Sequence, residues 1–173
     1  MAVTHSLAHT YPGPATPPGA MLDYVNRHLA NLYTVSSDTF VTAFYGIYEP
    51  RDRTLTYASA GHNPPRLKRC QDGSLALLDG ARGLPLGILA TEKYAETTYQ
   101  LVPGDQLVLY TDGIVEAQNA AGEQFGMGRL DKVLENCAVG APGLLESVLA
   151  AVEEFAAGRP AHDDRTVLVA KVS

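Results

Sequence analysis

Residues 106–113 read QLVLYTDG, an apolar run that ends in an acidic turn. The run 106–110 is typical of a buried β-strand, because it is short, apolar and bounded by turn residues. A second stretch, residues 161–169, reads AHDDRTVLV and places its acids before the apolar run. If these two strands are antiparallel neighbours, the exit of the first lies beside the entry of the second. We therefore expect Asp112 and Asp163 to lie together at one edge of a sheet.

Carboxylates packed in this way repel one another unless a cation or a proton lies between them. Their hard oxygen atoms suit Mg²⁺ or Mn²⁺, so the pattern predicts a metal site. A structural explanation remains open for each motif. Asp-Gly is a common turn dipeptide, and Asp163 with Asp164 forms a polar loop before a strand in many proteins. His162, which precedes this pair, is a candidate to support a metal ligand.

The remaining pattern predicts an α+β fold, because strands and helices occur in runs rather than in strict alternation. A helical fragment is expected over residues 1–10, and apolar spacing predicts amphipathic helices. Alternating or β-branched runs predict strands, and residues 79–89 are predicted to form a tight loop with one extended piece. The expected helices cover residues 19–33, 114–118, 128–137 and 142–157; the expected strands cover residues 40–48, 55–60, 66–70, 75–78, 94–101, 106–110 and 165–172.

The loop AGHNPP, residues 60–65, follows the second expected strand and places a histidine beside an asparagine and two prolines. His62 in such a loop is a candidate catalytic acid, but histidines of this kind more often hold the loop in shape through hydrogen bonds. We therefore expect Gly61 and His62 to have a structural or supporting role.

Composition excludes several classes of protein. The chain has 173 residues, 46% of them apolar and 18% charged, which allows one domain with a buried core. The net charge of −6 argues against a nucleic-acid partner. The chain contains no apolar run long enough to span a membrane, and residues 1–10 do not have the pattern of a signal peptide. Cys70 and Cys137 are in no zinc-binding spacing, so reduced thiols and a cytoplasmic location are expected.

Four segments in this order carry a resemblance: FVTAFYGIYEPRDRTLTYASAGHNPPRL, GLPLGIL, LVPGDQLVLYTDGIVEAQN and AHDDRTVLVAKV. Together they resemble the SpoIIE/RsbU-type serine phosphatases, the bacterial branch of the metal-dependent PPM (type 2C) family. The resemblance implies an α-β-β-α sandwich of two antiparallel sheets flanked by helices. It also implies two Mn²⁺ or Mg²⁺ ions and water that attacks a phosphoserine or phosphothreonine directly.

By this resemblance, Asp112 and Asp163 are metal ligands and Gly113 allows close approach beside the ligand. Asp164 stands where many relatives have Asn, so only a supporting role is carried over. The expected substrate is a phosphorylated STAS-type anti-sigma-factor antagonist, and the family implies an upstream sensor or receiver domain.

The first third of the family domain carries a GGDxxD-like and a DVxGHG-like segment, and this sequence contains neither. We therefore expect residues 1–173 to form a single SpoIIE-type domain that lacks its N-terminal third, including about two strands and the bridging aspartate. Such a chain would bind metal weakly and be inactive or nearly so. Its unpaired sheet edges would favour self-association. Two other hypotheses are a non-catalytic, phosphatase-derived interaction module and an unrelated α+β protein with structural Asp turns.

Overall fold

The computed structural model describes residues 2–32, 39–135 and 139–173. The chain divides into two compact units, which we describe separately. The first comprises residues 1–62 and 79–101, and the second comprises residues 63–78 and 102–173. No helix in the described ranges has both the length and the apolar character needed to cross a bilayer.

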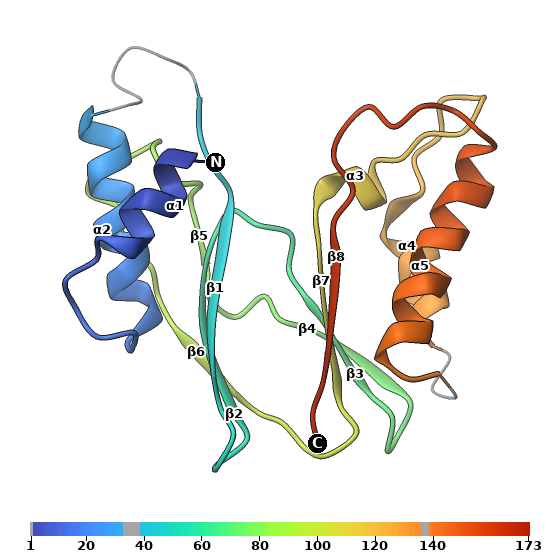
Figure 1. Cartoon of the computed structure of the whole chain (residues 1–173), viewed down its shortest axis with the longest axis horizontal. Coiled ribbons are helices and arrows are strands. Elements are labelled where there is room, and N and C mark those ends of the chain that lie inside the picture. Colours follow the sequence, from blue (N-terminus) through green and yellow to red (C-terminus); the bar gives the residue numbers. More distant parts are fainter. Residues whose placement is uncertain (1, 33–38, 136–138) are drawn as a thin grey trace. The chain divides into compact units, whose positions relative to one another are not determined.

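The first unit is a helical layer packed on a small sheet (Figure 1). The central strand, β2, pairs antiparallel with β1 and β6 and parallel with β5. Helix α2 buries Leu22, Val25 and Leu29 against the sheet, and each such side chain contributes about 1.5–3 kcal/mol of apolar burial. The elements of this unit are α1 (Ala2–His9), α2 (Pro18–Leu32), β1 (Ala43–Glu49), β2 (Thr54–Ala60), β5 (Arg82–Gly83) and β6 (Thr97–Gln100).

The second unit has a four-stranded antiparallel sheet in the order β4-β3-β7-β8. Helices α4 and α5 cover one face of this sheet, and their apolar side chains join those of β7 in one core (Figure 1). The elements of this unit are β3 (Arg66–Arg69), β4 (Ser74–Leu77), β7 (Gln106–Tyr110), α3 (Asp112–Val115), α4 (Gly126–Leu134), α5 (Ala141–Ala156) and β8 (Val167–Lys171).

The predicted α+β class, with two sheets and flanking helices, is confirmed. The expectation of purely antiparallel sheets was wrong for β5, where Ser59 and Ala60 pair in parallel with Arg82 and Gly83. A parallel pair needs a long crossover, and the chain between β2 and β5 provides one that includes the β3–β4 hairpin.

Several predicted boundaries also change. The strand expected over residues 94–101 is limited to β6, and β1 begins at Ala43 rather than at residue 40. The helix expected from residue 114 begins at Asp112, because the chain turns into α3 directly after Thr111. The described residues leave out residue 1, residue 33 and residues 136–137, which belong to the helices predicted over 1–10, 19–33 and 128–137 and include Cys137.

Candidate functional site

Strands β7 and β8 bring the two acidic motifs together. They pair antiparallel, with Tyr110 opposite Val167, and the backbone N–H of Thr111 donates to the carbonyl of Thr166 over 3.0 Å. Asp112 therefore follows the last pair of this ladder, at the end of the sheet where the segment that carries Asp163 leads into β8. The adjacency predicted from the sequence is confirmed for the backbone.

Thr111 joins the Asp112 turn to the segment 163–166 by hydrogen bonds. Its hydroxyl donates to the backbone carbonyl of Asp164 over 3.0 Å and accepts a hydrogen bond from the backbone N–H of Thr166, also over 3.0 Å. The hydroxyl does not cap α3, although Thr111 occupies the N-cap position of that helix. Sequence reasoning missed this role, because a threonine between a strand and Asp-Gly looks like an ordinary cap.

Gly113 lies directly against the second acidic segment. A Cβ atom built at this position would stand 2.5 Å from the carbonyl oxygen of Asp164 and 3.3 Å from that of Asp163. The lack of a side chain is what allows this approach, which the family resemblance implied. Gly113 itself is buried, whereas Asp112, Asp163 and Asp164 are exposed.

Each candidate carboxylate makes one short-range hydrogen bond to the backbone. Oδ1 of Asp112 accepts from the N–H of Gly113 over 3.0 Å, and Oδ1 of Asp163 accepts from the N–H of Asp164 over 2.7 Å. These bonds orient the carboxylates, and the second oxygen of each accepts no hydrogen bond from the described residues. Two exposed carboxylates of this kind suit Mg²⁺ or Mn²⁺ in their chemistry.

The number of protein ligands is small. Among the described residues, no group of three or more His, Cys, Asp and Glu side chains is placed to hold a metal ion. Asp112 and Asp163 therefore fit such an ion in kind but offer only part of a coordination shell. Their role as metal ligands stays a prediction.

A cavity of about 290 Å³ lies beside Asp163 within the second unit. Gly113, His162 and Asp163 contribute to its wall, together with Glu116, Arg159 and Arg165. His162 thus lies at the candidate site, as a supporting residue would, although it is exposed and no hydrogen bond joins it to Asp163 in the described part of the chain. Sequence reasoning missed both arginines, because neither belongs to a motif by itself.

Gly61 and His62 belong to the first unit, and their local roles are structural. Gly61 adopts a φ of +69°, and a Cβ atom there would stand 2.5 Å from Cγ of Pro85. Nδ1 of His62 lies 3.3 Å from the hydroxyl oxygen of Thr42, which ties the loop to the start of β1. These contacts agree with the expected loop-shaping role, and a role for either residue in the chemistry stays a prediction.

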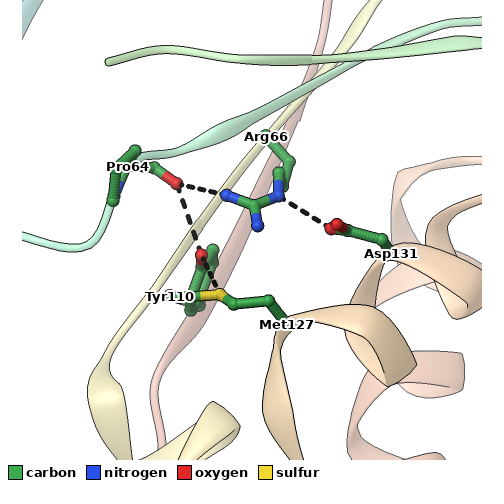
Figure 2. A network of polar contacts seen from close by, with 5 residues as sticks. All are labelled: Pro64, Arg66, Tyr110, Met127 and Asp131. Carbon is green, nitrogen blue, oxygen red and sulfur yellow. Dashed lines mark hydrogen bonds and ion pairs between the residues drawn. The ribbon is translucent and has the colours of Figure 1, made fainter.

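A partly buried polar network supports the strand that leads to Asp112 (Figure 2). Nε of Arg66 donates to Oδ1 of Asp131 over 2.7 Å, and Nη1 donates to the carbonyl of Pro64 over 3.1 Å. The Tyr110 hydroxyl lies 3.3 Å from the same carbonyl and 3.2 Å from the sulfur of Met127. Burial raises the pKa of the Tyr110 phenol, Arg66 opposes this shift and Asp131 adds to it. The network therefore joins α4 to β3 and β7.

The fold is that of PP2C phosphatases. The SiaA PP2C domain of Pseudomonas aeruginosa superposes with a TM-score of 0.81 at 23% identity, over 99% of this chain and 67% of that one. The phosphatase domain of SpoIIE from Bacillus subtilis, presoaked with Mn, gives a TM-score of 0.63 at 15% identity, over 99% of this chain and 72% of that one. These two similarities establish the fold.

Sequence comparison extends from the fold to the family. The chain is 30% identical over 157 residues to the phosphoserine phosphatase RsbU of Bacillus subtilis, a match that covers 88% of this chain. It spans 44% of the length of RsbU. The sequence model of the family described as stage II sporulation protein E (SpoIIE) matches residues 1–173, and the chain therefore belongs to the SpoIIE family.

Proposed function

We propose that this chain supplies Asp112 and Asp163 to a metal-dependent phosphoprotein phosphatase site that acts on phosphoserine or phosphothreonine. One observation carries the proposal: in a chain that matches the SpoIIE family throughout, the Asp112 turn and the 163–164 segment are held together at the end of β7 and β8. The carboxylates are exposed, oriented and only partly used by hydrogen bonds.

The residues of this chain have separate tasks in the proposed site. Asp112 and Asp163 would hold Mn²⁺ or Mg²⁺, of which the complete family domain binds two. Such an ion, when bound, activates water and neutralises charge on a phosphoryl group. Thr111 and Gly113 hold the two acidic segments in register. Asp164 contributes mainly its backbone carbonyl and N–H, because these are the groups that bond to Thr111 and Asp163.

We also propose that residues 1–173 alone have little or no activity. Two protein carboxylates are a weak site for Mg²⁺, which usually keeps several waters and relies on further ligands. The resemblance assigns the bridging aspartate to a GGDxxD-like segment, and this sequence contains no such segment. The chain would then form the later two-thirds of the family domain.

The substrate class follows from the relatives. RsbU, which is 30% identical to this chain over 157 residues, is named as a phosphoserine phosphatase. We propose that the complete protein acts on a phosphorylated STAS-type anti-sigma-factor antagonist, under control of an upstream sensor or receiver domain.

Metal binding tests the site without requiring turnover. Isothermal titration with Mn²⁺ should show weak binding by the wild-type chain and at least about tenfold weaker binding after Asp112→Asn or Asp163→Asn, because each change removes a charged ligand. Asp72→Asn, in the β3–β4 turn of the same unit, is the matched control and should bind like the wild type. Equal affinity in all four proteins would overturn the assignment of the ligands.

Activity is tested by restoring the absent segments. A fusion that carries the GGDxxD and DVxGHG strands of a family member before residue 1 should hydrolyse p-nitrophenyl phosphate with Mn²⁺, and Asp112→Asn should abolish this turnover. The unfused chain should stay near background. Rapid turnover by the unfused chain that is lost in Asp112→Asn would refute its proposed inactivity.

The second candidate function is a non-catalytic interaction module. The small ligand number favours it, since the described residues contain no group of three metal-binding side chains placed together. A module would bind its partner protein equally well with and without Mn²⁺, and the fusion would show no turnover. A folded fusion with Mn²⁺-dependent turnover would exclude this function.

A further inference from the structure

The cavity beside Asp163 is lined by an arginine whose side chain forms no hydrogen bond with the described residues. Arg165 lies between the acidic pair and β8 and lines this cavity. Its Nε atom is buried and donates no hydrogen bond to any group in the described part of the chain. Buried polar donors are nearly always paired, since an unpaired one costs about 1–3 kcal/mol. Because Arg165 lines the cavity, an acceptor that enters it and reaches the guanidinium would supply the missing partner.

A second arginine in the wall is held in a fixed orientation. Nη1 of Arg159 donates to the backbone carbonyl of Asn119 over 2.7 Å. The Asn119 loop is itself hydrogen-bonded, because Oδ1 of Asn119 accepts from the N–H groups of Ala121 and Glu123, each over 3.0 Å. No ion pair joins Arg159 to a carboxylate among the residues that the structure describes. The charge of Arg159 is thus oriented by a neutral group.

The chemistry of this wall matches an oxyanion with several acceptor atoms. Guanidinium groups present planar, fixed donors that pair with phosphate or carboxylate oxygens, and pre-orientation lowers the cost of binding. Gln118 and Gln124, which line the same cavity and face each other across a β-bridge, add neutral amide groups. The cavity volume of about 290 Å³ leaves room for a phosphoryl group together with part of the residue that carries it.

Two carboxylates in the same wall oppose anion binding. Glu116 and Asp163 both line the cavity. Their charge would weaken the attraction of a bare anion for the arginines, and a cation on Asp163 would remove part of that repulsion. Anion binding at the arginines and cation binding at Asp163 should therefore strengthen each other. Of the oxyanions that guanidinium groups accept, a phosphate monoester is the one that the adjacent metal site would use.

We propose that Arg165 and Arg159 form a phosphate subsite that receives the phosphoryl group of the substrate or the released phosphate ion. The identification of the anion as a phosphoryl group rests on the proposed phosphatase function. The presence of an anion subsite rests on the cavity and its two arginines alone. Arg165 is the principal residue, because its side chain makes no hydrogen bond within the described residues.

The test measures binding of inorganic phosphate by the chain in EDTA, so that no metal is required. In ¹H–¹⁵N spectra, the Nε–Hε resonances of Arg165 and Arg159 should shift on phosphate addition, and equimolar acetate should shift them less. Arg165→Gln should weaken phosphate binding by about tenfold or more, the range expected for loss of a charge-assisted donor. Arg165→Lys should recover only part of the affinity, because lysine restores the charge without the parallel N–H donors of a guanidinium group.

Arg82→Gln is the matched control, because Arg82 is an exposed arginine of the first unit that pairs with Asp79. It should bind phosphate like the wild type. Absence of Nε–Hε shifts at millimolar phosphate, or equal binding by Arg165→Gln, would overturn the subsite. These results are independent of Mn²⁺ titration and of turnover by the fusion, so failure of the subsite and failure of the phosphatase function are separable.

Discussion

Gly113 and Asp164 lie so close that a Cβ atom on residue 113 would stand 2.5 Å from the Asp164 carbonyl oxygen. The atom in the way belongs to the backbone, so it cannot move aside like a flexible side chain. The position of the second acidic segment relative to Asp112 therefore depends on a glycine at residue 113.

Gly113→Ala should push the 163–164 segment away from the Asp112 turn. We expect a loss of about 1–3 kcal/mol in unfolding free energy, as for other overpacked sites, and weaker Mn²⁺ binding. Urea unfolding and Mn²⁺ titration measure the two effects. Gly128→Ala is the control. Gly128 lies on α4, and a Cβ atom at this position would meet nothing within 4 Å. Full Mn²⁺ affinity in Gly113→Ala would show that the close approach does not matter for the site.

Thr111→Val should loosen the same connection from the other side. Valine keeps the shape of threonine but removes the hydroxyl that bonds to Asp164 and Thr166. A loss of about 0.5–1.5 kcal/mol in unfolding free energy is expected, because two solvent-exposed backbone groups exchange the hydroxyl for water. Thr111→Ser should retain most of the stability, since it keeps the hydroxyl. If valine and serine behave alike in urea unfolding, the hydroxyl has no stabilising role.

The sequence predicts the part of this site that depends on strand order. An apolar run before Asp112 and another after Asp164 are enough to expect two strands that meet at one edge, and β7 and β8 do so. The contacts of Thr111 and Arg165 are not predictable in this way, because they depend on which side chains face each other after pairing. A parallel pair as short as β5 leaves no periodic signal in a loop rich in glycine and proline.

The pairing of Arg66 with Asp131 is likewise not predictable from the sequence. A strand that reads RLKR looks partly solvent-facing, yet the Arg66 side chain is only 7% exposed, because Asp131 on α4 covers and neutralises it. Nothing in the local sequence around either residue indicates a pairing 65 positions apart. The pairing of Arg66 with Asp131 forms only because α4 packs on the sheet.

Asp131→Asn should destabilise the second unit by leaving the Arg66 charge buried without its partner. Because the Asp131 side chain is 37% exposed, we expect a loss of about 2 kcal/mol, below the 3–5 kcal/mol typical of a fully buried pair. Arg66→Met combined with Asp131→Asn should lose less than the sum of the two single variants. Additive losses in urea unfolding would mean that the two side chains do not interact energetically.

Tyr94→Phe should reduce the loss of stability at alkaline pH. Burial raises the pKa of the Tyr94 phenol above its ordinary value, with Glu92 and Asp23 adding to the shift, and the hydroxyl donates to the Leu84 carbonyl over 2.9 Å. Above about pH 10 the unfolded chain releases this proton while the folded chain keeps it, so stability falls as pH rises. The slope for one such group is about 1.4 kcal/mol per pH unit.

The measurement is urea unfolding between about pH 8 and pH 11.5. Tyr94→Phe should be less stable at pH 8, because the hydrogen bond to Leu84 is lost, and should have a shallower slope above about pH 10. Tyr57 and Tyr110 also have raised pKa values, so part of the slope should remain. Tyr48→Phe, at a more exposed tyrosine, is the control. Parallel curves for the wild type and Tyr94→Phe would contradict the assignment.

Leu168→Lys should reduce self-association of the chain. Strand β8 is the end strand of its sheet in the described order, and Leu168 on it is 54% exposed. A sheet edge with an exposed apolar side chain favours pairing with a second chain, and a lysine there opposes it. Sedimentation velocity should show a concentration-dependent larger species for the wild type and less of it for Leu168→Lys. Leu32→Lys is the control, because Leu32 is an exposed leucine that lies on α2 and not on a sheet edge. It should leave self-association unchanged. A wild-type chain that stays monomeric at about 100 μM, far above the Kd of a stable dimer, would show that this edge does not pair.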